Sequence, residues 1–410
     1  MTSTMTHQLS AELSRYAQIG AAVDSNKSIP HYKDVPQLIR HSAPDYPVHC
    51  FSPTDLQERV QLFMQNFPGQ VGFAVKSNGE ALIVEHLVKA GVNFFDAASL
   101  KEIALVRSFD ANARILYDNP IKSRHEIEKA YFNYGVRSFA IDDENELEKI
   151  RSLIGRDKSV QVSVRFKIKG CYAAQDLNTK FGASPAQASA LLQKVEQAGY
   201  QAALTFHPGS QCYTPSAYKD FIYAAAMIAE TAGVRINMLN VGGGFPANYL
   251  NSEIPPLAEY FSAIDEQFNR YFSKQECELV CEPGRALVAS SGSLLCRVKH
   301  RRHDDKVIFI NDGIYGGFME QLVAYFKLPL KVYRNSKLLL DTAEDFLVYG
   351  PTCDPSDCFQ EKIQLPASIQ EGDWIEFGLT GAYGSATSTH FNGYSSEDYV
   401  IVEKGTSFQR

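Results

Sequence analysis

The stretch Val71–Asn78, read V-G-F-A-V-K-S-N, decides the fold of this chain. Its apolar run Val71–Val75 is typical of a short strand that is buried on both faces. Lys76 ends the run, turn-forming residues follow it, and a helical pattern of apolar residues begins at Ala81. The stretch therefore predicts a strand, a turn and a helix, with a lysine at the carboxyl end of the strand. An α/β barrel places catalytic groups at that position.

Strands and helices alternate on both sides of this stretch, which indicates parallel βαβ units. Counted from Val71, the pattern gives eight strands, the number that closes a (β/α)₈ barrel. The later strands are predicted at Asn93–Ala97, Ala113–Tyr117, Ser138–Ile141, Gln161–Phe166, Ala203–Phe206, Met238–Val241 and Leu279–Cys281. Helices are predicted at Asp55–Phe67, Glu80–Ala90, Ser99–Phe109, Ser123–Tyr134, Glu144–Ile154, Pro185–Ala198, Thr214–Ala232 and Leu257–Phe272. Only Lys167–Gly182 interrupts the alternation, and we expect it to be an inserted loop.

The pattern changes after about residue 290. Short strand-like runs separated by turn residues predict a β-rich second domain, at Leu294–Val298, Val307–Ile310, Lys331–Tyr333, Phe346–Tyr349 and Trp374–Phe377. A further strand at Val48–Phe51 precedes the barrel, after a helical start near Leu9–Ile19. We therefore expect residues 1–55 to contribute to the β domain, residues 56–290 to form the barrel, and residues 291–410 to complete the β domain.

Composition excludes several classes of protein. The 410 residues are 45% apolar and 21% charged, which is typical of a globular chain with a large core. The net charge of −7 argues against a nucleic-acid partner. We find no signal peptide and no apolar run long enough to cross a membrane, and the cysteines fit a reduced, cytoplasmic protein. The cysteine pairs lack the spacing and histidines of a zinc site, so no metal is expected.

Polar residues follow several of the predicted strands. Asp96 ends the second strand, His207 follows the sixth with Ser210 close behind, and Gly242-Gly243-Gly244 follows the seventh. Glu282-Pro283-Gly284-Arg285 follows the eighth. Each feature alone is more often a turn, a core contact or a surface ion pair. Together they meet Lys76 at one mouth of the barrel. A reactive lysine, a glycine-rich anion cradle and a histidine indicate pyridoxal 5′-phosphate (PLP).

Seven motifs extend this pattern over roughly residues 45–395. They read, in order, F-A-V-K-S-N, F-F-D-A-A-S, T-F-H-P-G-S, V-G-G-G-F-P, C-E-P-G-R, G-P-T-C-D-P-S-D and G-A-Y. The set resembles the fold-type III PLP-dependent decarboxylases, the group of ornithine and diaminopimelate decarboxylases. The G-P-T-C-D form resembles the ornithine/lysine branch more than the diaminopimelate branch.

The resemblance implies a role for individual residues. Lys76 binds PLP as a Schiff base, Glu282 pairs with the ring nitrogen, and His207 lies against the ring face. Cys353 returns a proton to the carbon that has lost CO₂, and Asp354 meets the distal amine of the substrate. Asp96 lies near Lys76, and the phosphate is held by Ser210, Gly243, Gly244, Gly284, Arg285 and Tyr383. The resemblance also implies a homodimer in which Cys353 and Asp354 complete the active site of the other subunit.

The chain departs from the ornithine branch in one place. In that branch, a second acid that binds the distal amine follows a D-G-x-Y-G motif by about a dozen residues. The motif is present here and includes Tyr315, which we also expect at the substrate, but the later positions read Leu322-Val323-Ala324-Tyr325. Glu320 substitutes for this acid, or else the substrate carries a modified distal amine, as in decarboxylases that act on siderophore precursors.

Three further alternatives remain on sequence grounds. Diaminopimelate is a possible substrate. Alanine racemases share the barrel and the lysine, but no tyrosine here has the context of their catalytic tyrosine. A non-catalytic regulator of the antizyme-inhibitor type would be expected to lose the cofactor residues, which are all present. The leading prediction is therefore decarboxylation of an ornithine- or lysine-like amino acid.

Overall fold

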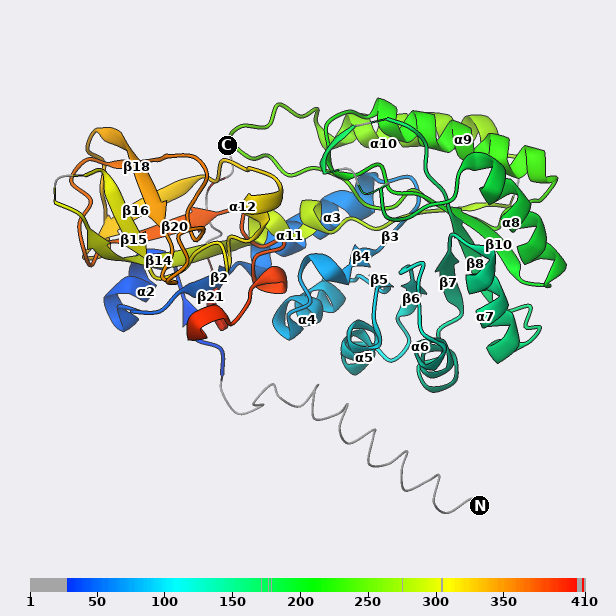
Figure 1. The fold of residues 1–410 in the computed structure, drawn as a ribbon, viewed down its shortest axis with the longest axis horizontal. Helices are drawn as coiled ribbons and strands as arrows, with labels where there is room; N and C mark the ends of the chain where they lie inside the picture. The colour runs from blue at the N-terminus through cyan, green and yellow to red at the C-terminus, as the bar shows by residue number, and fades with distance from the viewer. Residues whose placement is uncertain are drawn as a thin grey trace, which may run out of the picture.

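The computed structural model describes residues 28–170, 172–175, 177, 179–274, 276–303, 305–403 and 408. Figure 1 shows a barrel ringed by helices on one side and a β-rich body on the other. The helix predicted near Leu9–Ile19 lies outside the described residues. No helix in the described part of the chain is both long and apolar enough to cross a membrane.

The barrel sheet is parallel, and its strand segments follow the order β3-β13-β12-β10-β8-β7-β6-β5-β4. Its first strand is split at Gly72: Cys281 of β13 pairs with Val71, and Phe95 of β5 pairs with Phe73. A Cβ on Gly72 would lie 2.6 Å from the ring of Phe94, so this position needs glycine. The split strand joins the two ends of the sheet and confirms the predicted eight-stranded barrel. The segments are β3 Gln70–Val71, β4 Phe73–Ala74, β5 Phe94–Ala97, β6 Arg114–Tyr117, β7 Ser138–Ile141, β8 Gln161–Arg165, β10 Gln201–Thr205, β12 Met238–Asn240 and β13 Glu278–Cys281.

Helices cover the outside of the barrel, and several begin where the sequence places a capping serine. The side chains of Ser52, Ser99, Ser123 and Ser184 each accept a hydrogen bond from a backbone N–H three residues later. The helix predicted over Ser123–Tyr134 is instead a short α-helix followed by a π-helical turn, Lys129–Asn133. The helices are α3 Pro53–Asn66, α4 Ala81–Lys89, α5 Leu100–Phe109, α6 Arg124–Glu128, α7 Glu144–Ile154, α8 Pro185–Gln197, α9 Ser216–Ala232, α10 Leu257–Phe272 and α11 Arg285–Val288.

The stretch expected to be an inserted loop contains a strand. β9 (Ala173–Gln175) pairs antiparallel with β11 (Ser210–Cys212), which follows the sixth strand of the barrel. Because this pairing joins two segments far apart in the sequence, the pattern of residues within either segment could not predict it. It fixes the backbone around Ser210 at the barrel mouth.

The second body is built on the long strand β14 (Gly292–Arg301). β14 pairs with β2 (Val48–Phe51), β20 (Trp374–Gly378) and β15 (Val307–Ile310), so the segment before the barrel joins this sheet as predicted. The exact boundaries at residues 55 and 290 stay a prediction. The remaining elements are β1 His31–Tyr32, α2 Val35–Ser42, α12 Glu320–Val323, β16 Leu330–Arg334, β17 Lys337–Leu338, β18 Ala343–Tyr349, β19 Ile363–Pro366 and β21 Asp398–Val402.

Candidate active site

Lys76 lies on the 3₁₀ turn Val75–Ser77, directly after β4. Its Nζ is 2.8 Å from Oδ2 of Asp96, and its side chain is 42% exposed whereas that of Asp96 is 3% exposed. Burial lowers the pKa of Lys76, but the Asp96 carboxylate outweighs this effect and holds that pKa above its usual value. In the PLP-free protein, the Asp96 carboxylate therefore keeps Lys76 charged.

His207 follows β10 and faces the glycines of the next strand end. Its Nδ1 accepts a hydrogen bond from the Gly209 N–H at 3.1 Å, which leaves the ring proton on Nε2. Burial, together with the charges of Lys76 and Arg165, holds the pKa of His207 well below its usual value. A neutral imidazole is suited to stacking on an aromatic ring.

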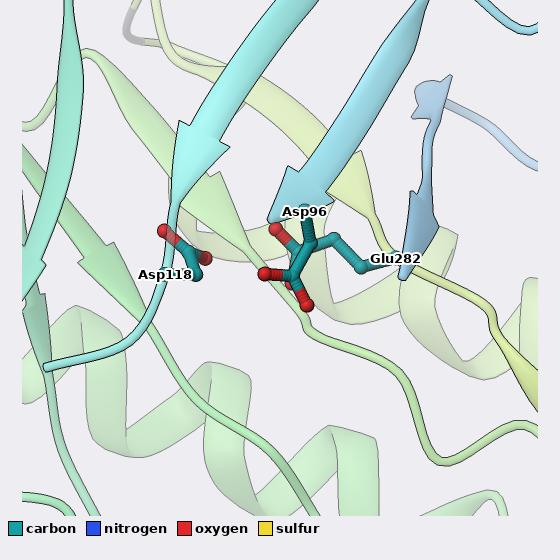
Figure 2. A group of neighbouring side chains, drawn as sticks. All are labelled: Asp96, Asp118 and Glu282. Atoms are coloured by element: carbon teal, nitrogen blue, oxygen red, sulfur yellow. The ribbon is translucent and has the colours of Figure 1, made fainter. Parts of the chain in front are cut away.

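Glu282 follows β13 and is buried, with 5% of its surface exposed. Figure 2 shows it beside Asp96 and Asp118, and one oxygen of each lies within 4.8 Å of the others. Burial raises the pKa of Glu282 well above its usual value, and the charges of Asp118 and Asp96 raise it further. Such a carboxyl can pair with a protonated ring nitrogen. Three carboxylates at this spacing resemble a cation site, and the Lys76 ammonium already lies against one of them.

Asp118 is a site residue that the sequence analysis missed. It directly follows β6, whose predicted range ended at Tyr117, so the same rule that singled out Asp96 would have found it. Asn240, buried in β12, was missed because it lies inside a predicted strand.

Arg285 is the centre of an anion cradle. Its Nη1 donates to the Tyr249 hydroxyl at 2.8 Å and its Nη2 to the Ser210 hydroxyl at 3.1 Å. The Arg285 side chain is only 4% exposed. Its buried Nε has no hydrogen-bond partner among the described residues. Because a buried N–H of a charged group requires an acceptor, this cradle fits an anion such as phosphate.

Three glycines near these strand ends lie too close to their neighbours to carry a side chain. A Cβ on Gly244, whose φ is +89°, would lie 2.5 Å from the Gly209 carbonyl oxygen. A Cβ on Gly243 would lie 2.8 Å from the Glu282 carbonyl oxygen, and one on Gly284 would lie 2.8 Å from Ser77. The backbone at these positions lies so close to neighbouring atoms that only glycine fits, which is typical of a phosphate-binding loop.

Tyr383 closes the cradle from the second body. Its φ of +56° is uncommon for a residue other than glycine, and its N–H donates to the Ser77 carbonyl at 2.8 Å. Its ring centroid lies 4.9 Å from Cζ of Arg285. Strained backbone of this kind is concentrated at functional sites. The residues expected at the cofactor therefore lie together at the barrel mouth: Lys76, Asp96, His207, Ser210, Gly243, Gly244, Glu282, Gly284, Arg285 and Tyr383.

Glu320 has a partner other than the one we expected. Its two carboxylate oxygens accept from Nη1 and Nη2 of Arg285, the first contact at 2.8 Å. A role in substrate binding, which stays a prediction, would require this carboxylate to serve Arg285 and an amine together.

Tyr315, Cys353 and Asp354 form a second group. The Tyr315 hydroxyl donates to Asp354 Oδ2 at 2.6 Å, and this bond lowers the pKa of Asp354. Cys353 is exposed, and its N–H donates to Asn392 Oδ1 at 3.0 Å. Among the described residues, the contacts of this group do not include Lys76 or its neighbours.

The fold and these residues are those of a barrel enzyme with a lysine, buried carboxyl groups and an anion cradle at its mouth. Known proteins agree with this class. A family model described as "pyridoxal-dependent decarboxylase, pyridoxal binding domain" matches residues 54–289. Decarboxylase flvG of Aspergillus flavus is 34% identical over 80% of this chain and 79% of the relative. Antizyme inhibitor 2 of Xenopus laevis is 32% identical over 78% of this chain and 73% of the relative.

Among solved structures, lysine/ornithine decarboxylase from Vibrio vulnificus, complexed with cadaverine, superposes with a TM-score of 0.79. It is 26% identical, and the match covers 90% of this chain and 98% of that one. This chain belongs to the fold-type III pyridoxal-dependent decarboxylases. Its cofactor is PLP, and its reaction class is that of a carboxy-lyase, as the sequence predicted.

The cradle yields a first testable prediction. We expect Arg285→Ala to weaken PLP binding by at least about tenfold to a hundredfold, since one charge-assisted hydrogen bond contributes about 1.5–3 kcal/mol. A fluorescence titration of the PLP-free protein measures this change. Arg114→Ala is the matched control, because Arg114 pairs with Glu278 at the opposite end of the barrel strands. Unchanged PLP affinity in a folded Arg285→Ala protein would exclude the phosphate assignment.

Proposed function

We propose that the protein decarboxylates a basic diamino acid of the ornithine or lysine type and releases CO₂ and an amine. The observation that carries the proposal is the meeting of Lys76, Glu282 and the incompletely paired Arg285 at one barrel mouth. When bound, PLP supplies an electron sink for the electron pair that CO₂ leaves behind. The chain must then hold the cofactor, orient the substrate and return a proton.

Each of these tasks has a candidate. Lys76 would hold the cofactor covalently, Asp96 would orient the Lys76 side chain, and the neutral His207 would support the ring. Glu282 would pair with the ring nitrogen, and its carboxylate would stabilise the protonated form of the ring. Arg285 holds the phosphate, helped by Ser210, Tyr383, Gly243, Gly244 and Gly284. Cys353 returns the proton to carbon.

We also propose a homodimer in which the second group completes the site of the partner. Cys353 is exposed and its contacts remain within its own body, so a second chain would bring it to a cofactor. The seven described cysteines are free, which supports a cytoplasmic location.

The substrate follows from Asp354. Since the Tyr315 hydroxyl keeps this carboxylate ionised, it suits a distal ammonium group. The Vibrio relative, bound to the diamine cadaverine, supports a diamino-acid substrate. We assign the position of the missing second acid to Ala324, which follows the exposed Leu322 and Val323. This apolar wall would also leave room for the alternative substrate, a diamino acid whose distal nitrogen is modified.

We expect Ala324→Asp to lower the KM for free ornithine by roughly tenfold to a hundredfold. The reason is that one added charge-assisted hydrogen bond contributes about 1.5–3 kcal/mol, at 1.4 kcal/mol per decade. Val323→Asp, one residue away and 57% exposed, is the control for added charge. Steady-state assays of both variants test this assignment. If wild type has a micromolar KM for ornithine that Glu320→Gln does not change, the apolar wall has been misinterpreted.

The experiment that tests the proposed function is an assay of CO₂ release from a panel of substrates. The panel contains ornithine, lysine, diaminobutyrate, diaminopimelate and N-acylated diamino acids. Release of CO₂ with one of the diamino acids is the expected result. Racemisation without CO₂ would support the racemase alternative. Inactivity together with failure to bind PLP would support a regulator like the Xenopus relative.

A further inference from the structure

A second carboxylate lies behind the residue assigned to the ring nitrogen. One side-chain amide, Nδ2 of the buried Asn240, donates to Glu282 Oε1 at 2.7 Å and to Asp118 Oδ2 at 3.0 Å. Asn240 is itself fixed, because its Oδ1 accepts from the Gly242 N–H at 2.8 Å. The amide therefore holds the two carboxyl groups side by side, with Glu282 buried and Asp118 half-buried.

The other oxygen of Asp118 needs a proton. Oδ1 of Asp118 is buried and has no hydrogen-bond partner among the described residues. Two ionised carboxylates at this separation repel each other strongly when buried. A proton held by one carboxyl and donated to the other removes the repulsion and satisfies the unpaired oxygen.

The surrounding charges favour the same arrangement. The Lys76 ammonium is paired with Asp96 and His207 is neutral, so neither donates directly to this pair. Burial and the charge of Asp96 raise the pKa of Asp118, whereas Glu282, Lys76 and Arg165 lower it. The net result is a pKa of about 6. Burial and then the charge of Asp118 raise the pKa of Glu282 well above its usual value, so we place the shared proton on Glu282, which Asn240 holds beside Asp118.

We propose that Asp118 is a positioning residue that keeps Glu282 as a carboxylic acid in the PLP-free protein and enables Glu282 to protonate the pyridine nitrogen. In this step the O–H bond of Glu282 breaks and an N–H bond forms, with no change of oxidation state. Both carboxylates would then stabilise the cationic ring, with Asn240 still donating to each. The inference rests on the proposed pairing of Glu282 with the ring nitrogen.

Infrared difference spectroscopy tests this assignment without any turnover. The spectrum of the PLP-bound protein minus that of the PLP-free protein should show the loss of a carboxylic-acid C=O band in wild type. The same loss should be absent in Glu282→Gln. In PLP-free Asp118→Asn, the band should titrate away at a pH lower by at least about one unit, because a neighbouring charge is removed. Asp118→Glu should restore the higher midpoint.

Glu376→Gln is the matched control, since Glu376 is a buried carboxyl of the second body whose pKa burial also raises. That variant should leave the difference band unchanged. The inference is overturned if wild type loses no carboxylic-acid band, a result that requires no variant to fold. It is also overturned if Asp118→Asn has the wild-type midpoint. If instead Glu282→Gln binds PLP with wild-type affinity and visible spectrum, the pairing of Glu282 with the ring fails, and with it the proposed function of that residue.

Discussion

Replacing Lys76 with alanine is expected to reduce CO₂ release by at least about 10³-fold, because covalent attachment of the cofactor is lost. The fold should survive the change. The Lys76 side chain is 42% exposed, and its one ion pair is with Asp96. Steady-state assays and visible absorbance spectra of the purified variant measure the two effects.

Lys76→Arg is the informative control for this experiment. Arginine keeps the positive charge beside Asp96 but does not deprotonate to act as a nucleophile. It should therefore be as inactive as the alanine variant. Substantial activity in Lys76→Arg would mean that the positive charge of Lys76, rather than its nucleophilic amine, is what the reaction uses.

Two inactive chains are expected to restore activity when they are mixed. If Cys353 acts in the site of the partner, a heterodimer of Lys76→Ala and Cys353→Ala chains has one site built from two intact halves. Random exchange at equal amounts gives about half heterodimers, so about a quarter of the wild-type sites should return, by the symmetry of a twofold dimer.

The design separates assembly from chemistry. Subunit exchange is verified with two affinity tags on the mixed chains. A double variant that carries both changes in one chain, mixed with wild type, is the control for nonspecific stabilisation. Complete exchange without recovered activity would show that each site lies within a single chain.

The architecture was predictable because parallel strands leave a simple pattern in the sequence. Apolar runs followed by Lys76, Asp96, His207 and Glu282 place these residues at one barrel mouth whatever the details of the loops. The predicted strand Val48–Phe51 joins the β-rich second half as expected, and its pairing with β14 in particular is a finding of the structure.

Long-range contacts and charge balance were not predictable. The split at Gly72 arises from barrel closure, and the β9–β11 pair joins two loops. The pKa of Lys76 depends on its 2.8 Å contact with Asp96, which no local pattern contains. Glu320 looked like a free acid in sequence because its partner, Arg285, is 35 residues away.

The most direct test of the account is to locate the bound cofactor. Borohydride reduction of the purified protein, followed by trypsin digestion and mass spectrometry, should place one phosphopyridoxyl group on Lys76. Because the modified lysine resists cleavage, the group should appear on the uncut peptide Val60–Lys89. A modification on another lysine, or none in protein that releases CO₂, would contradict the central claim.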